Sequence, residues 1–254
     1  MFRYFRKPVS LTVRDLPSIR GLYGVTMKKD GQVVAINGDG YAYAQSGDTV
    51  CTVARHPDLD FTAYGEYVNS GVIYLFDTNQ KLDYKTRYQN LARLVDKTMV
   101  LNPCVFTNDP FRYVRQHFNS QTTEGFILTP VHGKHRVFKY KLLNTVDFFI
   151  RDRQCWCLIS RNQYDTLGLT GAANDQDDYF LIPFHPCREY AGDDDQRVVE
   201  CLWKDGKWYK YRDRPDKTTQ YLKTGCGVNN YKICLDHYEN FLNPLTLDKL
   251  FSMI

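Results

Sequence analysis

Short stretches in which apolar and polar residues alternate run through most of the first half of the chain. Such stretches are rich in Tyr, Phe and Val and are interrupted by Asp-Gly and Asn-Gly pairs, a pattern that predicts strands joined by tight turns. Asn37-Gly38-Asp39-Gly40 is expected to turn the chain between two strands of a meander, and Asn69-Ser70-Gly71 between two more. The predicted strands are 26–30, 32–36, 41–44, 61–68 and 72–76.

Two segments of the first half follow a helical period instead. Between residues 84 and 100 the apolar residues Tyr88, Leu91, Leu94 and Val95 recur at helical spacing with Arg and Lys between them, which predicts a helix. A short helix is expected over 114–118, followed by strands over 125–129 and 137–141 that pair with each other. The first half is therefore predicted to be an α+β domain built mainly on antiparallel sheet.

The sequence pattern changes after Phe148-Phe149-Ile150, where a charged segment and then short predicted strands separated by Asn, Asp and Gly follow. Arg151-Asp152-Arg153 has the character of a charged connector, so we predict two domains, 1–150 and 151–254. In the second, strands over 198–203 and 207–211 flank Lys204-Asp205-Gly206, which is typical of a hairpin. Short strands around such turns favour a small five-stranded β-barrel of the oligonucleotide-binding (OB) type. Asn243-Pro244 limits the C-terminal segment to at most two short helices.

The composition is that of a folded globular protein without strong bulk charge. Hydrophobic residues make up 43% of the 254 residues and charged residues 24%, which excludes a disordered chain. The net charge of +4 is too small for nucleic-acid binding through bulk charge alone. No apolar run approaches the roughly 18 to 20 residues of a membrane helix, and the basic, aromatic N-terminus lacks the apolar stretch of a signal peptide. We expect a soluble intracellular protein without a membrane partner, cytoplasmic, with the nucleus left open.

Eight cysteines are spread over the chain without any C-x-x-C pair, so zinc-ribbon spacing is absent. In a chain without a secretory signal they are expected to be reduced thiols that pack as small hydrophobes. A metal site formed by Cys155, Cys157, His185 and Cys187 has no support in the sequence.

Candidate chemistry begins at Lys28-Lys29-Asp30-Gly31, where a lysine stands two residues before an Asp-Gly turn. Such a turn lets the backbone approach a ligand closely, which places the amine where a nucleophile is needed. Taken alone, the segment is more typical of an ordinary surface hairpin. The rest of the chain changes this interpretation, because acids and lysines recur on the predicted strands in a fixed order: Glu66, Asp77, Glu124, Lys139 and Lys141. The Lys-Tyr-Lys alternation points both of the last ammonium groups to one face of a strand.

This order resembles the covalent nucleotidyltransferase superfamily, which contains mRNA capping enzymes and polynucleotide ligases. Lys28 to Gly31 is similar to its motif I, K-x-D-G. Gly65-Glu66 resembles motif III, Tyr74 to Asp77 motif IIIa, Glu124-Gly125 motif IV, and Lys139 to Lys141 motif V. The resemblance implies an α+β fold with an antiparallel-sheet nucleotidyltransferase domain over 1–150 and a small OB-type β-barrel domain, with a C-terminal helical segment, over 151–254.

Further elements resemble the capping guanylyltransferases in particular. Their motif V continues as N-T-V-D-F, which Asn144 to Phe148 reproduces, and Leu128-Thr129-Pro130 stands where their motif IV is followed by F-T-P. Glu200-Cys201, Trp208 and Arg212 to Lys217 supply the elements of their motif VI. Two departures are more typical of viral than of cellular members. Gln32-Val33 replaces an arginine after motif I, and Thr218 to Tyr221 replaces Pro-Asn after motif VI.

The resemblance implies a role for each matched residue. Lys28 would form the covalent bond to the nucleotide and Phe76 would stack on its base. Carboxylates are hard oxygen ligands, so Glu66 and Glu124 would hold Mg²⁺ or Mn²⁺ or contact the ribose hydroxyls. Since a lysine must be neutral to attack phosphorus, nearby cations such as Lys139 and Lys141 would favour loss of its proton. The expected nucleotide-binding residues are Asp30, Gly31, Glu66, Phe76, Asp77, Lys139, Lys141, Asp147, Arg214, Asp216 and Lys217.

The activity implied is that of an mRNA guanylyltransferase. GTP and Lys28 would give a lysyl-N-GMP intermediate and pyrophosphate, and GMP would pass to the 5′-diphosphate end of RNA. On a mobile second domain, Arg214, Asp216 and Lys217 would orient the β- and γ-phosphates. Two alternatives remain: an ATP-dependent RNA ligase with the same lysine chemistry, and an inactive binding subunit of a capping or polymerase complex. Asn37 to Gly40 is better interpreted as a hairpin turn than as a methyltransferase G-x-G loop, and paired E-x-E strands are absent. A separate RNA triphosphatase and cap methyltransferase are therefore expected as partners.

Overall fold

A computed structural model describes residues 2, 5–118, 124–133, 136–141, 143–168, 173–176 and 179–252. The chain forms two compact units, Met1–Leu142 with Leu245–Ile254, and Leu143–Pro244. This division differs from the predicted domains 1–150 and 151–254 at both ends of the second unit. Residues 143–150 belong to the second unit because strand β12 (Val146–Arg151) is an inner strand of its sheet. Leu245 and Leu250 instead pack into the core of the first unit.

The first unit contains a five-stranded sheet, here called sheet A, in the order β1-β11-β10-β2-β9. All neighbouring strands are antiparallel except β1 and β11, which run parallel. Its core includes Tyr23, Val25, Phe126 and Leu128, and Val114 of helix α2 (Pro110–His117) joins it. The 3₁₀ helix η1 (Val13–Ser18) and helix α6 (Leu247–Ser252) also contribute core residues. The strands are β1 (Val9–Ser10), β2 (Tyr23–Met27), β9 (Cys104–Thr107), β10 (Gly125–Pro130) and β11 (Phe138–Lys141).

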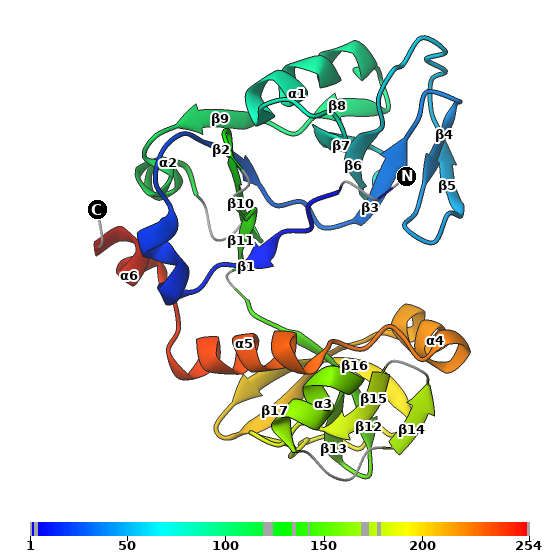
Figure 1. Ribbon diagram of the computed structural model, residues 1–254, viewed down its shortest axis with the longest axis vertical. Helices are drawn as coiled ribbons and strands as arrows, with labels where there is room; N and C mark the ends of the chain where they lie inside the picture. Colours follow the sequence, from blue (N-terminus) through cyan, green and yellow to red (C-terminus); the bar gives the residue numbers. More distant parts are fainter. Residues whose placement is uncertain are drawn as a thin grey trace. The chain divides into compact units, whose positions relative to one another are not determined.

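A six-stranded sheet in the same unit, sheet B, has the order β5-β4-β3-β6-β7-β8. The turn predicted at Asn37 to Gly40 is confirmed between β3 and β4, and the strand predicted over 32–36 is β3. The preceding strand of the predicted meander does not pair with β3, because β2 belongs to sheet A. Figure 1 shows helix α1 (Tyr84–Asn90) close to β7 and β8. The strands are β3 (Gln32–Ile36), β4 (Tyr41–Tyr43), β5 (Thr49–Thr52), β6 (Ala63–Tyr67), β7 (Ile73–Thr78) and β8 (Met99–Leu101).

The helix predicted over 84–100 is shorter than expected. Helix α1 continues as the 3₁₀ helix η2 (Leu91–Leu94), and Val95 then adopts an extended conformation. The Asp96 carboxylate accepts hydrogen bonds from the backbone N–H groups of Thr98 and Met99, which turns the chain into β8. An aspartate that accepts hydrogen bonds from the backbone N–H groups that follow it competes with continuation of the helix. The spacing of the apolar residues therefore predicted too long a helix.

The second unit contains a six-stranded antiparallel sheet, sheet C, in the order β14-β15-β13-β12-β16-β17, in place of the five strands predicted. Helix α5 (Tyr231–Leu242) packs on β12 and β13, and helix α4 (Pro215–Thr224) on β16. Helix α3 (Arg161–Leu167) lies against β13 and β15. The strands are β12 (Val146–Arg151), β13 (Gln154–Ser160), β14 (Ala173–Gln176), β15 (Tyr179–Pro183), β16 (Arg197–Lys204) and β17 (Lys207–Asp213).

At its inner strand β12, sheet C is buried on both faces, as the alternation of side chains along this strand shows. Phe148 and Ile150 enter one core and Phe149 enters the other, since successive residues of a strand point to opposite faces. The hairpin predicted at Lys204-Asp205-Gly206 is confirmed between β16 and β17. In the described part of the chain, no helix has the length and apolar character needed to cross a membrane.

Buried cysteines are part of the larger core of this unit. Cys155, Cys157, Cys201 and Cys234 are fully buried among its apolar side chains, and all eight cysteines are free thiols. Burial raises the pKa of Cys155 and of Cys234 well above the usual range of a thiol. These thiols therefore pack as small hydrophobes.

Candidate active site

The residues Lys28–Gly31 connect the two sheets of the first unit. The first predicted strand was expected to continue to Asp30, but β2 of sheet A ends at Met27, and β3 of sheet B begins at Gln32. The backbone N–H of Lys28 still donates to the carbonyl of Gly125, at 2.9 Å. A Cβ atom on Gly31 would lie 2.2 Å from the carbonyl oxygen of Tyr67, so only glycine allows this close approach to β6. The turn predicted from the Asp-Gly pair therefore lies at the junction of two sheets and is not a hairpin.

The side chain of Lys28 is held beside a carboxylate. Its Nζ donates to Oε2 of Glu124 at 2.6 Å and to the carbonyl of Lys29 at 3.1 Å. The Lys28 side chain is 17% exposed and that of Glu124 is 47% exposed. The amine is thus largely shielded yet adjacent to a solvent-accessible acid. Glu124 lies directly before β10, the neighbour of β2, and this pairing brings two residues 96 positions apart into contact.

Glu66 lies on β6, on the side of the link that belongs to sheet B. Burial raises the pKa of its carboxyl to about 7. The positive charge of Lys28 and a hydrogen bond from the backbone N–H of Gly31 oppose this rise, while the charges of Asp30 and Glu124 add to it. Five of the predicted site residues therefore act on one another.

Lys139 lies on β11, where it is opposite Ile127 of β10 and Ser10 of β1. Burial and, to a smaller extent, the charges of Lys141, Lys7 and Lys28 together lower the pKa of its ammonium group to about 8. Four cationic groups therefore act on one another in this part of sheet A. Such a cluster is unfavourable by itself and is stabilised by a bound polyanion.

Phe76, which was predicted to stack on the base, packs within an aromatic cluster. The ring of Phe5 lies 6.0 Å from that of Phe76 and 5.2 Å from that of Tyr64, and Phe2 also approaches Tyr64, at 5.8 Å. Sequence reasoning did not assign Phe5 to the site. The aromatic and basic character of the N-terminal residues was the available signal.

Asp77, predicted to contact the nucleotide, is engaged by an arginine. Its Oδ1 accepts from Nε of Arg87 at 2.7 Å and its Oδ2 from Nη2 at 3.2 Å, and both side chains are largely buried. Burial raises the pKa of Asp77, and the hydrogen bonds and charge of Arg87 oppose that effect. In this structure Asp77 therefore attaches helix α1 to β7.

Asn102 is a second residue that the sequence did not single out. It is 5% exposed, and its side-chain Nδ2 donates to the carbonyl of Met27 at 3.1 Å. Its backbone N–H donates to the carbonyl of Leu75 at 2.8 Å. Asn102 therefore connects β2 with β7 directly before Lys28, and a single asparagine in Leu-Asn-Pro carried no signal of that role.

The acidic residues near Lys28 fit a cation that arrives with a nucleotide. Among the described residues, no three His, Cys, Asp or Glu side chains lie close enough together to form a metal site. Mg²⁺ is usually held by one or two carboxylates together with water and substrate phosphates. Glu66 and Glu124 supply two such carboxylates, so the residues present fit this mode of binding.

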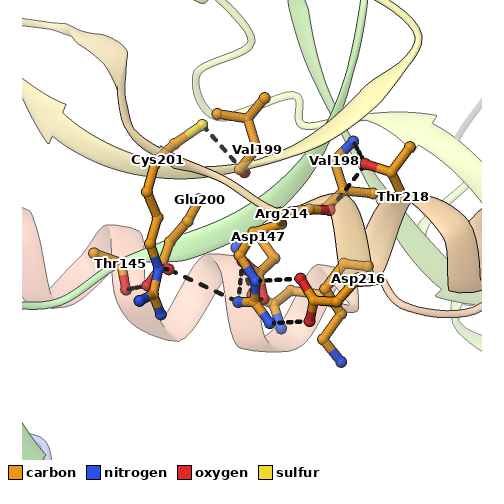
Figure 2. Close-up of polar contacts among 12 residues, drawn as sticks. Thr145, Asp147, Val198, Val199, Glu200, Cys201, Arg214, Asp216 and Thr218 are labelled. Carbon is orange, nitrogen blue, oxygen red and sulfur yellow. Dashed lines mark hydrogen bonds and ion pairs between the residues drawn. The ribbon is translucent and has the colours of Figure 1, made fainter. Parts of the chain in front are cut away.

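The remaining predicted residues form a polar cluster in the second unit, drawn in Figure 2. Arg214 donates from Nη1 to both carboxylate oxygens of Asp147, at 2.9 and 3.0 Å. Its Nε and Nη2 donate to the two oxygens of Asp216, at 3.1 and 3.0 Å. Glu200 lies 3.7 Å from the same guanidinium. Arg214 is therefore surrounded by three carboxylates from three segments of the chain.

The backbone around this cluster is held in place by Thr218 and Asn229. The Thr218 hydroxyl donates to the carbonyl of Arg214 and accepts from the backbone N–H of Val198, both at 2.9 Å. Asn229 accepts from the backbone N–H of Asp147 at 2.8 Å through its side chain. Lys217, in contrast, donates from Nζ to Gln220 of its own helix, at 3.3 Å. Of the predicted phosphate-orienting residues, Lys217 is the least constrained.

Glu200 is bound from both sides within the same cluster. It accepts hydrogen bonds from the hydroxyl of Thr145 and from Nε of Arg212. Burial raises the pKa of Glu200, but these hydrogen bonds outweigh it, so that the pKa lies below its usual value. The elements assigned to motifs V and VI are thus in direct contact with each other.

No protein-family model matches the chain. It is 24% identical over 155 residues to a Kluyveromyces lactis protein named "Uncharacterized killer plasmid pGKl-2 protein 3"; the match covers 58% of this chain and 24% of the relative. The chain therefore spans about a quarter of the length of that relative.

Among solved structures, similar chains include three DNA ligases. A Lig E DNA ligase is 11% identical, with a TM-score of 0.45, over 82% of this chain and 98% of the ligase. A mycobacterial DNA ligase D complexed with ATP is 14% identical, with a TM-score of 0.42, over 83% of this chain and 94% of the ligase. The ATP-dependent DNA ligase of bacteriophage T7, in complex with ATP, is 12% identical, with a TM-score of 0.40, over 84% of this chain and 99% of the ligase.

Proposed function

We propose that the protein is an mRNA guanylyltransferase that carries GMP on Lys28 during transfer from GTP to RNA. The observation that carries this proposal is the position of the Lys28 amine, which lies 2.6 Å from Glu124 at the junction of sheets A and B. Glu66 and Lys139 interact electrostatically with the same amine. A shielded amine with an adjacent proton acceptor and additional cations suits covalent catalysis on a phosphate.

The first half-reaction forms a phosphorus–nitrogen bond. Nζ of Lys28 loses a proton from its ammonium form, and Glu124, which already accepts a hydrogen bond from it and is 47% exposed, is positioned to pass that proton on to water. The neutral amine then donates its electron pair to the α-phosphorus of GTP. The bond from that phosphorus to the α,β-bridging oxygen breaks, and pyrophosphate leaves with its electron pair. Loss of a second proton from Nζ leaves a phosphoramidate.

In the second half-reaction an oxygen of the terminal phosphate of 5′-diphosphate RNA attacks the same phosphorus. The phosphorus–nitrogen bond breaks, and Lys28 takes up protons again. Lys139 and Lys141 provide positive charge for the phosphates in both steps. Mg²⁺ or Mn²⁺, held by Glu66 and Glu124, would neutralise charge on the α-phosphate and on the departing pyrophosphate.

The second unit is proposed to be an OB-type domain whose Arg214, Asp216 and Lys217 orient the pyrophosphate leaving group. Arg214 already holds carboxylates with three nitrogens, a geometry that also suits phosphate oxygens. To bind a phosphate it must exchange at least one carboxylate partner for it. Such an exchange would connect nucleotide binding to the state of this cluster.

The choice of GTP and RNA follows from the capping-type elements. Asp147 belongs to the N-T-V-D-F element and Arg214 to the motif VI element, and the contact between them supports their acting as one unit. A separate RNA triphosphatase would supply the 5′-diphosphate end, and a separate methyltransferase would act on the cap. We place this activity in the cytoplasm.

Incubation with labelled GTP or ATP, followed by denaturing gel electrophoresis, tests the proposal. We expect GTP to label the protein through an acid-labile, base-stable bond that Lys28→Ala abolishes. Lys29→Ala is the matched control, because Lys29 is the neighbouring lysine and its Nζ lies instead over the ring of Tyr74, at 4.3 Å. Labelling from ATP would indicate ligase-type chemistry, and absence of labelling would indicate a binding subunit.

A further inference from the structure

Strand β17, at one edge of sheet C, combines cationic and aromatic residues (Figure 1). Its sequence begins Lys207-Trp208-Tyr209-Lys210-Tyr211-Arg212. Trp208 is completely buried in the core, whereas Tyr209 is 40% and Tyr211 is 49% exposed. Two large aromatic side chains are therefore presented to solvent along one end strand.

These two rings differ from the other aromatic side chains around them. Trp203 contacts both Trp208 and Tyr238, with ring centroids 5.4 and 5.1 Å apart. Within the part of the chain that the structure describes, neither Tyr209 nor Tyr211 packs against another aromatic ring. Their faces are available for stacking.

Cationic side chains share the face of Tyr209. Tyr209 is opposite Leu202 of β16, and Lys207 is opposite Lys204, two residues along the same strands. Because alternate residues of a strand lie on one face, Lys204, Lys207 and Tyr209 belong to the same face of the sheet. Tyr211 lies in a β-bulge, because Cys201 is opposite Lys210 and Glu200 is opposite Arg212, which leaves Tyr211 without a partner on β16. Its side chain is exposed two residues beyond Tyr209 on the same edge strand.

The two lysines are available to a polyanion although both have acidic neighbours. Nζ of Lys204 lies 3.9 Å from Asp205, and Nζ of Lys207 lies 3.1 Å from Glu189. The lysine side chains are 75% and 52% exposed, and exposed ion pairs of this kind contribute little free energy. A phosphate can therefore replace either carboxylate at small cost.

We infer that the surface formed by Lys204, Lys207, Tyr209 and Tyr211 binds single-stranded RNA. Unpaired bases stack on exposed aromatic rings regardless of sequence, and neighbouring cations bind the backbone phosphates. A duplex keeps its bases stacked inside and leaves the two rings without partners. An acidic peptide would engage the lysines alone. The identity of the strand as the RNA that receives GMP rests on the proposed function, whereas the surface itself rests on β16 and β17.

Fluorescence anisotropy with a labelled single-stranded RNA of about 20 nucleotides tests the inference. The Tyr209→Ala/Tyr211→Ala variant is expected to bind roughly ten-fold more weakly or worse. The Tyr209→Phe/Tyr211→Phe variant keeps both rings and should bind like the unmodified protein. Tyr179→Ala is the matched control, because Tyr179 lies on β15 of the same sheet and is 48% exposed, and it should leave binding unchanged.

Salt dependence measures the lysine contribution. Replacing two phosphate-binding lysines in Lys204→Gln/Lys207→Gln should reduce the slope of log K against log salt by about 1.4 for a single strand. A slope equal to that of the unmodified protein would contradict phosphate binding by these residues. Competition by polyglutamate as strong as by unlabelled RNA would also overturn the inference.

Adduct formation separates failure of this inference from failure of the proposed function. Labelling of Lys28 by GTP in the absence of RNA should be unchanged in Tyr209→Ala/Tyr211→Ala, and Lys28→Ala should still bind RNA. Labelling by GTP together with unchanged RNA binding in the double tyrosine variant would overturn the RNA surface alone. Tyrosine-dependent RNA binding without labelling would support the surface and contradict the guanylyltransferase.

Discussion

Arg214 holds Asp147 through a single nitrogen, with Nη1 2.9 and 3.0 Å from the two carboxylate oxygens. The side chains are 19% and 14% exposed. Burial raises the pKa of Asp147, and the charge of Arg214 offsets only part of that rise. Asp147 therefore depends on Arg214 to remain ionised in this position, whereas Arg214 stays charged and needs the carboxylate to compensate its largely buried charge.

The first prediction concerns the strength of this pair. Arg214→Ala and Asp147→Ala should each lower the free energy of unfolding by roughly 1 to 3 kcal/mol, because each leaves a charged group short of a hydrogen-bonding partner. In the double variant the loss should be smaller than the sum, with a coupling of roughly 0.5 to 3 kcal/mol. Urea denaturation of the four proteins measures this, and strictly additive losses would show that the two residues do not stabilise each other.

A second prediction separates the two half-reactions. Arg214→Lys keeps the charge and loses the planar fork that holds two phosphate oxygens, so formation of the Lys28–GMP adduct should slow by roughly ten-fold or more. Transfer of GMP to RNA from a preformed adduct should be spared, because pyrophosphate has already left. Lys217→Ala should act in the same direction.

Rapid-quench measurement of each half-reaction checks this prediction, with Lys223→Ala, an exposed lysine of the same helix, as the control. Adduct formation at the unmodified rate in both variants would mean that the cluster has only a structural role.

The third prediction follows from Lys139, whose pKa burial lowers to about 8. The ammonium is present below that pH and is lost as pH rises through it, so kcat/KM for GTP should fall above about pH 8 as the phosphates lose a cation. Lys139→Arg remains charged and should lack this decrease. The pH profile of adduct formation measures this decrease. If kcat/KM for GTP falls above about pH 8 in Lys139→Arg as in the unmodified protein, another group causes the decrease.

The fourth prediction concerns Glu66, whose pKa burial raises from 4.5 to about 7. The folded state holds this proton more tightly than the unfolded state, so the contribution of Glu66 to stability falls as pH rises from about 4.5 to 7. Glu66→Gln, which cannot ionise, should therefore gain stability relative to the unmodified protein over that interval, by up to about 1.4 kcal/mol per unit of pKa displacement. Thermal unfolding of both proteins at pH 5 and pH 8 tests this. A stability difference between Glu66→Gln and the unmodified protein that is the same at both pH values would refute it.

The fifth prediction concerns Phe5, which packs on Phe76 and Tyr64. If Phe76 stacks on the base, removal of the Phe5 ring should weaken its support and raise KM for GTP by roughly 2- to 10-fold, since an aromatic pair contributes about 0.5 to 1.5 kcal/mol. Tyr41→Ala, an exposed tyrosine of sheet B, is the control. A lower KM in Phe5→Ala would show instead that the Phe5 ring occupies the place of the base.

Local pattern was enough to predict most strands and the turns between them. Alternation of apolar and polar residues reports which side chains share a face, and a strand such as β3 or a hairpin such as β16–β17 needs no distant information. The order of Lys28, Glu66, Glu124 and Lys139 likewise indicated a charged site before any geometry was known. These features depend on neighbours along the chain, which the sequence contains by itself.

Tertiary structure alone decided which distant groups meet. The boundary of the units depends on β12 pairing with β13 and β16, and such pairing is chosen by burial across the whole sheet. Asp77 is bound by Arg87, ten residues away, and Arg214 by Asp147, 67 residues away, because desolvated carboxylates need a cation wherever packing provides one. Long-range packing also places Asn102 beside Met27 and Phe5 beside Phe76. No local pattern in the sequence indicates either contact.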